Sequence, residues 1–326
     1  MKSWLKNFPP FWTLVSTHPW LLFPVAIVTG LLIGFLIRDV PIMGYDWMTM
    51  FAGNQATDVY YPPWTSLILW PLAELPPRLG LAFINGITIA TVALTTYFQG
   101  LGNSKGWRWL AVFMALFSVQ TLVVLWTGHI DGLALLGIWS LPWTMPIVLM
   151  KSTFIGFVVF TRKEWFLTAL LFGLVSLLIW PNWPAELLAT MEFRNTHPAS
   201  VGWERTGFLP VILGIFLFLK SKRGDIFQNL AVGAMVYPFI MPYHHLVLLP
   251  ALGELKGRRL LFAWLAAWLI IVPVGIGTGY FVYFLFPFLI WWFRRSKKEG
   301  EGTWLEFFQT KLSSAKRFLT KTRSPA

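Results

Sequence analysis

Long stretches without a charged residue are the feature that most constrains this sequence. A helix needs about 20 apolar residues to cross a bilayer core that is about 30 Å thick. Three stretches reach this length without a single charge, and they cover residues 20–37, 79–98 and 109–127. Residues 165–180 fall slightly short, and residues 260–293 form one uncharged run that is long enough for two spans. The sequence therefore predicts a polytopic membrane protein.

Three further apolar segments are short or interrupted, and they cover residues 132–161, 207–219 and 226–253. Proline breaks the first and the last of these segments, and such breaks are tolerated in membranes where the backbone lines a cavity. Counted together, the segments predict an all-α integral membrane fold of about ten transmembrane helices with short re-entrant or interfacial helices. The first apolar run begins at Trp20 and is of span length, so we expect a signal anchor rather than a cleavable leader.

Composition supports this class and excludes several others. Hydrophobic residues make up 56% of the chain and charged residues 12%, whereas a soluble domain has about 25% charged residues. A soluble enzyme, a disordered chain and a fibrous protein are therefore excluded. The absence of cysteine excludes a disulfide framework, a thiolate metal site and a cysteine nucleophile.

The basic residues predict the orientation. With the N-terminus inside, the outer side of the membrane keeps only Arg38, Arg78, Arg194 and Arg205 of the 26 Lys and Arg. This bias follows the positive-inside rule and predicts a multi-pass plasma-membrane protein with both ends in the cytoplasm. Residues 1–293 would form the membrane domain, with long outer loops at 38–78 and 181–206. Residues 294–326 would form a basic amphipathic tail that binds the anionic inner leaflet rather than nucleic acid.

The first outer loop carries two candidate catalytic acids, Asp46 and Asp58. Pro62 and Pro63 precede residues 63–72, which are too few to span and predict a short helix at the membrane interface. An aspartate at this boundary is partly desolvated, which favours the protonated form and suits a general base. Taken alone, each aspartate also fits an ordinary solvated loop carboxylate.

Further polar residues stand in or beside apolar segments. His129 and Asp131 follow the third span and fit either a ligand for sugar hydroxyls or phosphate, or a polar turn. Lys151 lies within an apolar stretch and fits either a phosphate site or a side chain that reaches to the interface. His244 and His245 interrupt a later segment; neighbouring helical residues point in different directions, so joint metal binding is not expected.

The order of these motifs resembles the GT-C glycosyltransferases, and most closely glycosyltransferase family 87. The resemblance rests on Asp46-Trp47, on Tyr61-Pro62-Pro63 leading to residues 71–76 (Pro-Leu-Ala-Glu-Leu-Pro), and on Gly128-His129-Ile130-Asp131. Lys151-Ser152 and Pro242-Tyr243-His244-His245 follow in the family's order, so that the resemblance covers roughly residues 20–260. His129 stands where the family has Gln, and Ser152 where it often has Pro. The spacing from Asp46 to Tyr61 is shorter than the family's, which leaves open whether Asp46 or Asp58 takes the catalytic position. We take Asp46 as the preferred base and Asp58 as the reserve.

The resemblance implies a transfer reaction on the outer face of the membrane. The donor would be a mannose-like hexose on a polyprenyl phosphate, and the acceptor a lipid or glycan hydroxyl. The aspartate would deprotonate that hydroxyl, which attacks the anomeric carbon with inversion. Lys151 and either His244 or His245 would bind the phosphate, His129 with Asp131 would bind sugar hydroxyls, and Tyr61 would be a further substrate-binding residue. Neither a cofactor nor a metal ion is expected.

Two other functions remain open from the sequence. A transporter or lipid flippase also uses broken helices and an ionisable residue inside the membrane. Transporters often show two halves with matching interrupted segments, and this chain has no clear internal repeat. A catalytically inactive GT-C-like scaffold is the third alternative, and it predicts that no cavity opens at Asp46.

Overall fold

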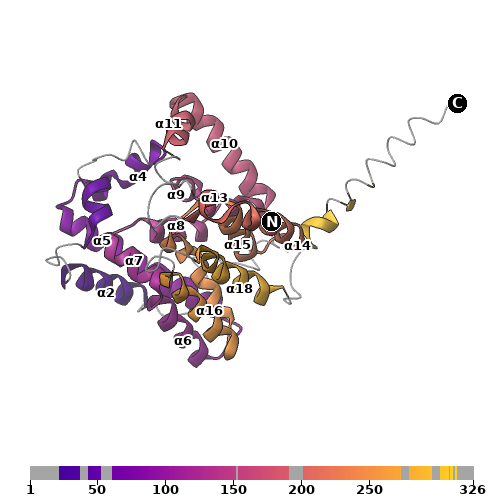
Figure 1. Ribbon diagram of the computed structural model, residues 1–326. Helices are drawn as coiled ribbons and strands as arrows, with labels where there is room; N and C mark the ends of the chain where they lie inside the picture. The colour runs from indigo at the N-terminus through magenta and orange to yellow at the C-terminus, as the bar shows by residue number, and fades with distance from the viewer. Residues whose placement is uncertain are drawn as a thin grey trace.

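The computed structural model of this protein is a bundle of short and medium helices (Figure 1). The structure describes residues 22–36, 43–52, 61–151, 153–190, 201–272, 279–295, 302–307, 309–310 and 313. The elements of the first half are α2 (Leu22–Leu36), η2 (Trp47–Phe51), α4 (Trp64–Ala73), α5 (Pro77–Gln99), α6 (Lys105–Leu116), α7 (Val119–Thr127), α8 (Asp131–Trp139), α9 (Met145–Leu149) and η4 (Phe154–Thr161). The second half contains α10 (Lys163–Ile179), α11 (Trp183–Ala189), β1 (Val201–Gly202), α13 (Trp203–Thr206), α14 (Leu209–Lys220), α15 (Ile226–Val236), β2 (Phe239–Ile240), η5 (Pro242–Glu254), α16 (Arg258–Leu269), η6 (Tyr280–Phe284) and α18 (Leu285–Arg294). The prediction of an all-α fold is confirmed, apart from the two-residue antiparallel pair of β1 and β2.

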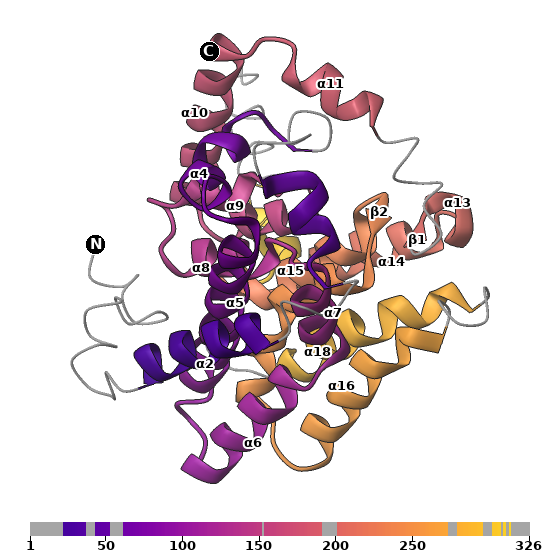
Figure 2. The same ribbon diagram turned by 90° about the vertical axis from the view of Figure 1, so that its left-hand side faces the viewer.

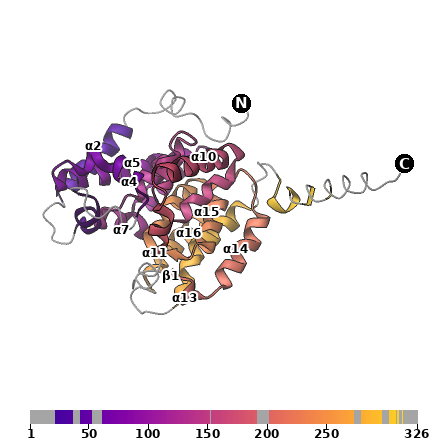
Figure 3. The ribbon, with the colours of Figure 1, turned by 90° about the horizontal axis from the view of Figure 1, so that it is seen from above.

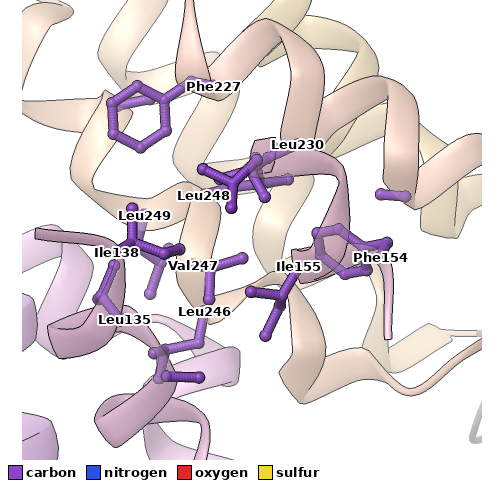
Figure 4. Packing of buried hydrophobic residues seen from close by; sticks show 14 of the residues in the cluster. Leu135, Ile138, Phe154, Ile155, Phe227, Leu230, Leu246, Val247, Leu248 and Leu249 are labelled. Atoms are coloured by element: carbon purple, nitrogen blue, oxygen red, sulfur yellow. The ribbon is translucent and has the colours of Figure 1, made fainter. Parts of the chain in front are cut away.

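The core of the bundle is built on three elements, α5, α15 and η5. Helix α5 starts with Pro77 in its first turn, where a missing N–H costs nothing, and it packs against α2, α6, α8 and η5. Helix α15 is buried along nearly its whole length and packs against α14, η4 and α18. In Figure 4, residues Leu246–Leu249 of η5 lie between α8 and η4, with Leu230 of α15 beside them.

Small residues allow η5 and α5 to approach closely. A Cβ atom at Gly253 would collide with the backbone oxygen of Thr96 on α5, and a Cβ at Gly100 would lie 2.7 Å from the backbone oxygen of Gly253. The same close fit occurs where Gly132 of α8 meets Thr88 of α5. These contacts fix α8 and η5, two elements that carry predicted site residues, against the same central helix.

Several outer helices expose large apolar side chains. Helix α10 has 17 residues, of which only Trp165 and Ser176 are buried. On α14, Leu209, Ile212 and Phe216 are each more than half exposed, and α16 exposes Phe262 in the same way. Figure 2 shows α10 at the periphery of the bundle. The outer faces of these helices are therefore apolar.

Fewer helices than predicted are long enough to cross a membrane. Among the described residues, α5 alone is both long and apolar enough, and two bent pairs, α6 with α7 and α10 with α11, raise the number to three. The bend is 47° between α6 and α7 and 96° between α10 and α11. Figure 3 shows α10 and α11 as two distinct helices. The structure therefore does not support about ten transmembrane helices. The physical reason is that the interrupted segments 132–161 and 226–253 are divided into short helices, none of which spans alone.

Candidate functional site

The structure brings seven polar and aromatic side chains together in the interior of the bundle. They come from the position before η2, the segment before α4, the α7–α8 junction, the segment after α9 and the start of η5. We call this group the polar cluster, and its members are Asp46, Tyr61, His129, Asp131, Lys151, Tyr243 and His244. Residues far apart in the sequence thus lie in one cluster. If each motif were only a polar turn, these residues would instead lie apart from one another.

A buried ion pair lies at the centre of the polar cluster. The Nζ atom of Lys151 is 3.0 Å from Oδ2 of Asp131, and both side chains are almost completely buried. The Nδ1 atom of His129 is 2.6 Å from the same Oδ2 atom, and the Nζ atom of Lys151 is 2.7 Å from Nδ1. A buried charge is stable only with an opposite charge beside it, so Lys151 and Asp131 depend on each other.

Local backbone structure explains how these three residues meet. Gly128 ends α7 with a φ of 73°, a left-handed conformation that glycine adopts at no steric cost. The turn places His129 beside Asp131, which is the first residue of α8. Lys151 follows the five-residue helix α9, whose early end leaves Lys151 buried beside α8. The proline-broken segment 132–161 therefore places the Lys151 ammonium group in the core.

Tyr61 and Asp46 form the edge of the polar cluster. The Tyr61 hydroxyl is 3.1 Å from Nε2 of His129, and Oδ2 of Asp46 is 3.9 Å from the same nitrogen. The Asp46 side chain is 15% exposed, against 3% or less for His129, Asp131 and Lys151. Asp46 precedes η2, where Trp47 donates a hydrogen bond from Nε1 to the backbone oxygen of Pro77. This bond ties the candidate base to the first turn of α5.

The two adjacent histidines have different surroundings. The ring of His244 lies 6.5 Å from that of His129 and accepts a hydrogen bond at Nδ1 from the backbone N–H of Met241. The ring of His245 is fully buried between Phe154 and Phe286, and neither of its nitrogens has a hydrogen-bond partner among the residues that the structure describes. Only His244 therefore belongs to the polar cluster.

Burial and the charges inside the polar cluster determine the protonation states of Asp131 and His244. Burial alone would raise the pKa of Asp131, but Lys151 and His129 outweigh burial and hold that pKa well below its usual range. Burial and the charge of Lys151 lower the pKa of His244 well below its usual value. Asp131 is therefore an anion and His244 is neutral, so the cluster holds a fixed ion pair beside neutral hydrogen-bonding groups.

Tyr243 is a member that we did not select from the sequence. Its ring lies 4.5 Å from that of His129 and 5.4 Å from the Nζ atom of Lys151, which is also 5.6 Å from the Tyr61 ring. The two tyrosines thus flank the ammonium group and place π faces near it. In the sequence, Tyr243 stands directly before His244, and this position was the signal that could have identified Tyr243.

Some predictions about the site have no structural outcome. Asp58 lies outside the described residues, as does Ser152. In the part of the chain that the structure describes, no three His, Asp or Glu side chains are placed to hold a metal ion.

We compared the chain with known proteins in three ways. No family model, curated protein or solved structure matches it. The resemblance to glycosyltransferase family 87 therefore remains a prediction from the sequence.

Proposed function

We propose that this protein is a membrane glycosyltransferase of the GT-C type, with short broken helices in place of some full spans. It transfers a mannose-like hexose from a polyprenyl-phosphate donor to an acceptor hydroxyl of a lipid or glycan. The reaction takes place at the outer face of the plasma membrane, without a metal ion, and both ends of the chain are cytoplasmic. The proposal rests on the polar cluster and on the apolar surface of the bundle.

The apolar surface of the bundle supports a membrane location. Water does not favour a helix such as α10, on which Leu171 is 63% and Leu178 is 85% exposed. Lipid chains can cover such a face, and α5 has the length for one crossing. The polyprenyl chain of the donor would lie in the same lipid bilayer as the exposed faces of these helices.

The central observation is an ammonium group held in place and linked through His129 to a partly exposed carboxylate. When the bond from the anomeric carbon to the phosphate oxygen breaks, negative charge builds up on the departing polyprenyl phosphate. The Nζ atom of Lys151 is fixed by Asp131 and flanked by Tyr61 and Tyr243. A cation that is already oriented stabilises this developing charge without further reorganisation.

We assign the role of general base to Asp46. It is the most exposed acid of the polar cluster and lies next to His129 at its edge. In the proposed step, Asp46 takes the proton of the acceptor hydroxyl, the hydroxyl oxygen bonds to the anomeric carbon, and the phosphate leaves with the bonding electrons. General-base catalysis of this kind contributes about 10²–10⁴-fold to the rate.

The test is transfer of labelled hexose from polyprenyl-phosphate hexose in membranes that contain the full-length protein. We expect Asp46→Asn to reduce transfer by about 10²-fold or more, because the amide cannot accept the proton. Glu74→Gln is the matched control, since Glu74 is an exposed acid after α4 in the same predicted loop, and it should keep full transfer. Asp58→Asn is assayed in parallel as the reserve base.

Two results would overturn the proposal. Full transfer by both the Asp46 and the Asp58 variants would exclude the proposed base. Movement of labelled donor across vesicle membranes, without any transfer to an acceptor, would instead assign the protein to the flippases.

A further inference from the structure

We propose that one end of the bundle is a binding surface for anionic phospholipid headgroups. This end, which we call the basic end, combines the start of α6, the start of α10, the end of α14, the start of α16 and the end of α18. Its exposed cations are Lys105, Lys163, Lys220, Lys256, Arg258, Arg259 and Arg295. The inference concerns a surface distant from the polar cluster and does not depend on the transfer reaction.

Contacts between the elements establish that the basic end is continuous. Asn103, before α6, donates a hydrogen bond to the backbone oxygen of Gly253, and Gln99 bonds to the side chain of Glu254. Glu254 pairs with Arg294 at the end of α18, and Arg294 pairs with Asp225, which follows α14. Apart from α10, the elements that carry the exposed cations are therefore joined to one another, and Figure 1 shows α6 beside α16.

Among the acids of this region, exposed Glu164 pairs with Lys163 at 4.0 Å, whereas Asp225 and Glu254 do not neutralise the surface. Arg294 is 6% exposed, and its Nε atom lies 3.0 Å from both carboxylate oxygens of Asp225. Its Nη1 atom is 2.6 Å from Oε2 of Glu254. Both acids are thus paired with a buried cation, while the cations around them face outward. The outward charge of the basic end is strongly positive.

The arrangement of cations over aromatic rings indicates a lipid surface rather than a soluble polyanion. The Nζ atom of Lys220 lies 4.2 Å from the centre of the Phe216 ring, and Arg295 lies 4.7 Å from that of Trp292. Both rings are about half exposed and stand one turn earlier on the same helix. Apolar rings in the hydrocarbon boundary and cations at headgroup level are the pattern of a membrane interface.

The beginning of the C-terminal tail is docked on the basic end. The guanidinium of Arg223 lies 4.3 Å from the centre of the Phe307 ring, and Trp304 stacks on Phe218 with 5.2 Å between ring centres. The Glu306 carboxylate accepts a hydrogen bond from the backbone N–H of Thr303, and the Thr303 hydroxyl accepts one from the backbone N–H of Glu306. These two bonds cap the helical turn that begins at residue 304. The tail, predicted from sequence to bind anionic lipid, thus begins at the surface that we propose for the same lipids.

The test measures the preference of the full-length protein in detergent for phosphatidylglycerol over phosphatidylcholine. Brominated forms of each lipid are titrated separately, and quenching of tryptophan fluorescence gives two relative binding constants. We expect the wild-type protein to prefer phosphatidylglycerol several-fold and to lose this preference at high salt. A basic residue near an anionic surface contributes about a five-fold change in binding.

Two exposed arginines provide a matched pair of variants. Arg258 and Arg78 each lie in the first turn of a helix, α16 and α5 respectively, but only Arg258 belongs to the basic end. Arg258→Gln should lower the preference by up to about five-fold, and Arg78→Gln should leave it unchanged. The triple variant Lys256→Gln, Arg258→Gln, Arg259→Gln should abolish most of it.

An equal loss in the Arg78 and Arg258 variants would overturn the proposal, as would a wild-type protein without any lipid preference. Binding of a short oligonucleotide that is weakened in the triple variant, without a preference for phosphatidylglycerol, would assign the basic end to nucleic acid and would also overturn it.

Discussion

At the scale of single residues, Lys151 and Asp131 should behave as one unit. Lys151→Met removes the cation and leaves the buried Asp131 carboxylate with much weaker compensation. We expect a loss of about 3–5 kcal/mol in the free energy of unfolding, which is typical when one partner of a buried pair is removed. Thermal unfolding of the full-length protein in detergent, followed by intrinsic fluorescence, measures this loss as a lower midpoint.

The double variant Lys151→Met, Asp131→Asn is the control for this interpretation. It removes both charges at once, so its midpoint should lie closer to wild type than that of Lys151→Met alone. Hexose transfer should be lost in both variants, because neither carries the cation. Independent, additive effects of the two substitutions on the midpoint would contradict the pairing.

The sequence could predict these residues individually but not their contacts. An ionisable side chain in an apolar segment is costly, and that cost singled out Lys151. Its distance from Asp131 depends on how α8 and α9 pack, which no local pattern encodes. The same limit applies to Tyr243, which looks like an ordinary interfacial aromatic residue until its ring is seen beside His129. His245 shows the reverse case, since its motif predicted a substrate-binding residue and packing places its ring between Phe154 and Phe286.

At the scale of elements, the contact of η5 with α5 should not tolerate a side chain at Gly253. A Cβ there meets the backbone of Thr96 and Gly100, which cannot rotate away as a side chain would. Gly253→Ala should therefore destabilise the protein by about 1–3 kcal/mol, the usual cost of overpacking. Since η5 also carries His244, the shift should reduce hexose transfer as well. Unfolding midpoints and transfer rates measure the two effects.

Gly106→Ala is the matched control for that prediction. Gly106 lies in α6 with open space around the position of a Cβ, and alanine is a better helix former by about 1 kcal/mol. This variant should be as stable as wild type or slightly more so. A Gly253 variant as stable as the Gly106 variant would show that the close approach is not required.

Helix positions were easier to predict than helix lengths. Proline at 142 and 146 indicated a break, and the structure ends α8 at Trp139 and starts α9 at Met145. Hydropathy, however, does not distinguish a lipid-facing span from a short helix buried in protein. Residues 242–254 form η5, an apolar helix in the core, rather than part of a span. Counting apolar segments therefore predicted about ten crossings, of which the described residues support one to three.

At the scale of the whole molecule, the candidate site and the basic end should face opposite sides of the membrane. Asp46 is linked to the first turn of α5 through the bond from Trp47 to Pro77. The basic end is linked to the last turn of α5 through Gln99 and Glu254. A helix of 23 residues is about 35 Å long, which is close to the thickness of the hydrocarbon core.

The absence of cysteine makes this arrangement directly testable, because any introduced thiol is the only one in the chain. Glu74→Cys and Lys256→Cys replace exposed residues near the two ends of α5. In intact cells, a membrane-impermeant maleimide should label the Glu74 variant and not the Lys256 variant. Permeabilised cells should show equal labelling of both, which controls for expression and reactivity. Labelling of both variants in intact cells would place both ends outside. Labelling of the Lys256 variant alone would invert the molecule and move the polar cluster to the cytoplasmic side, where a sugar nucleotide rather than a lipid-linked donor would be available.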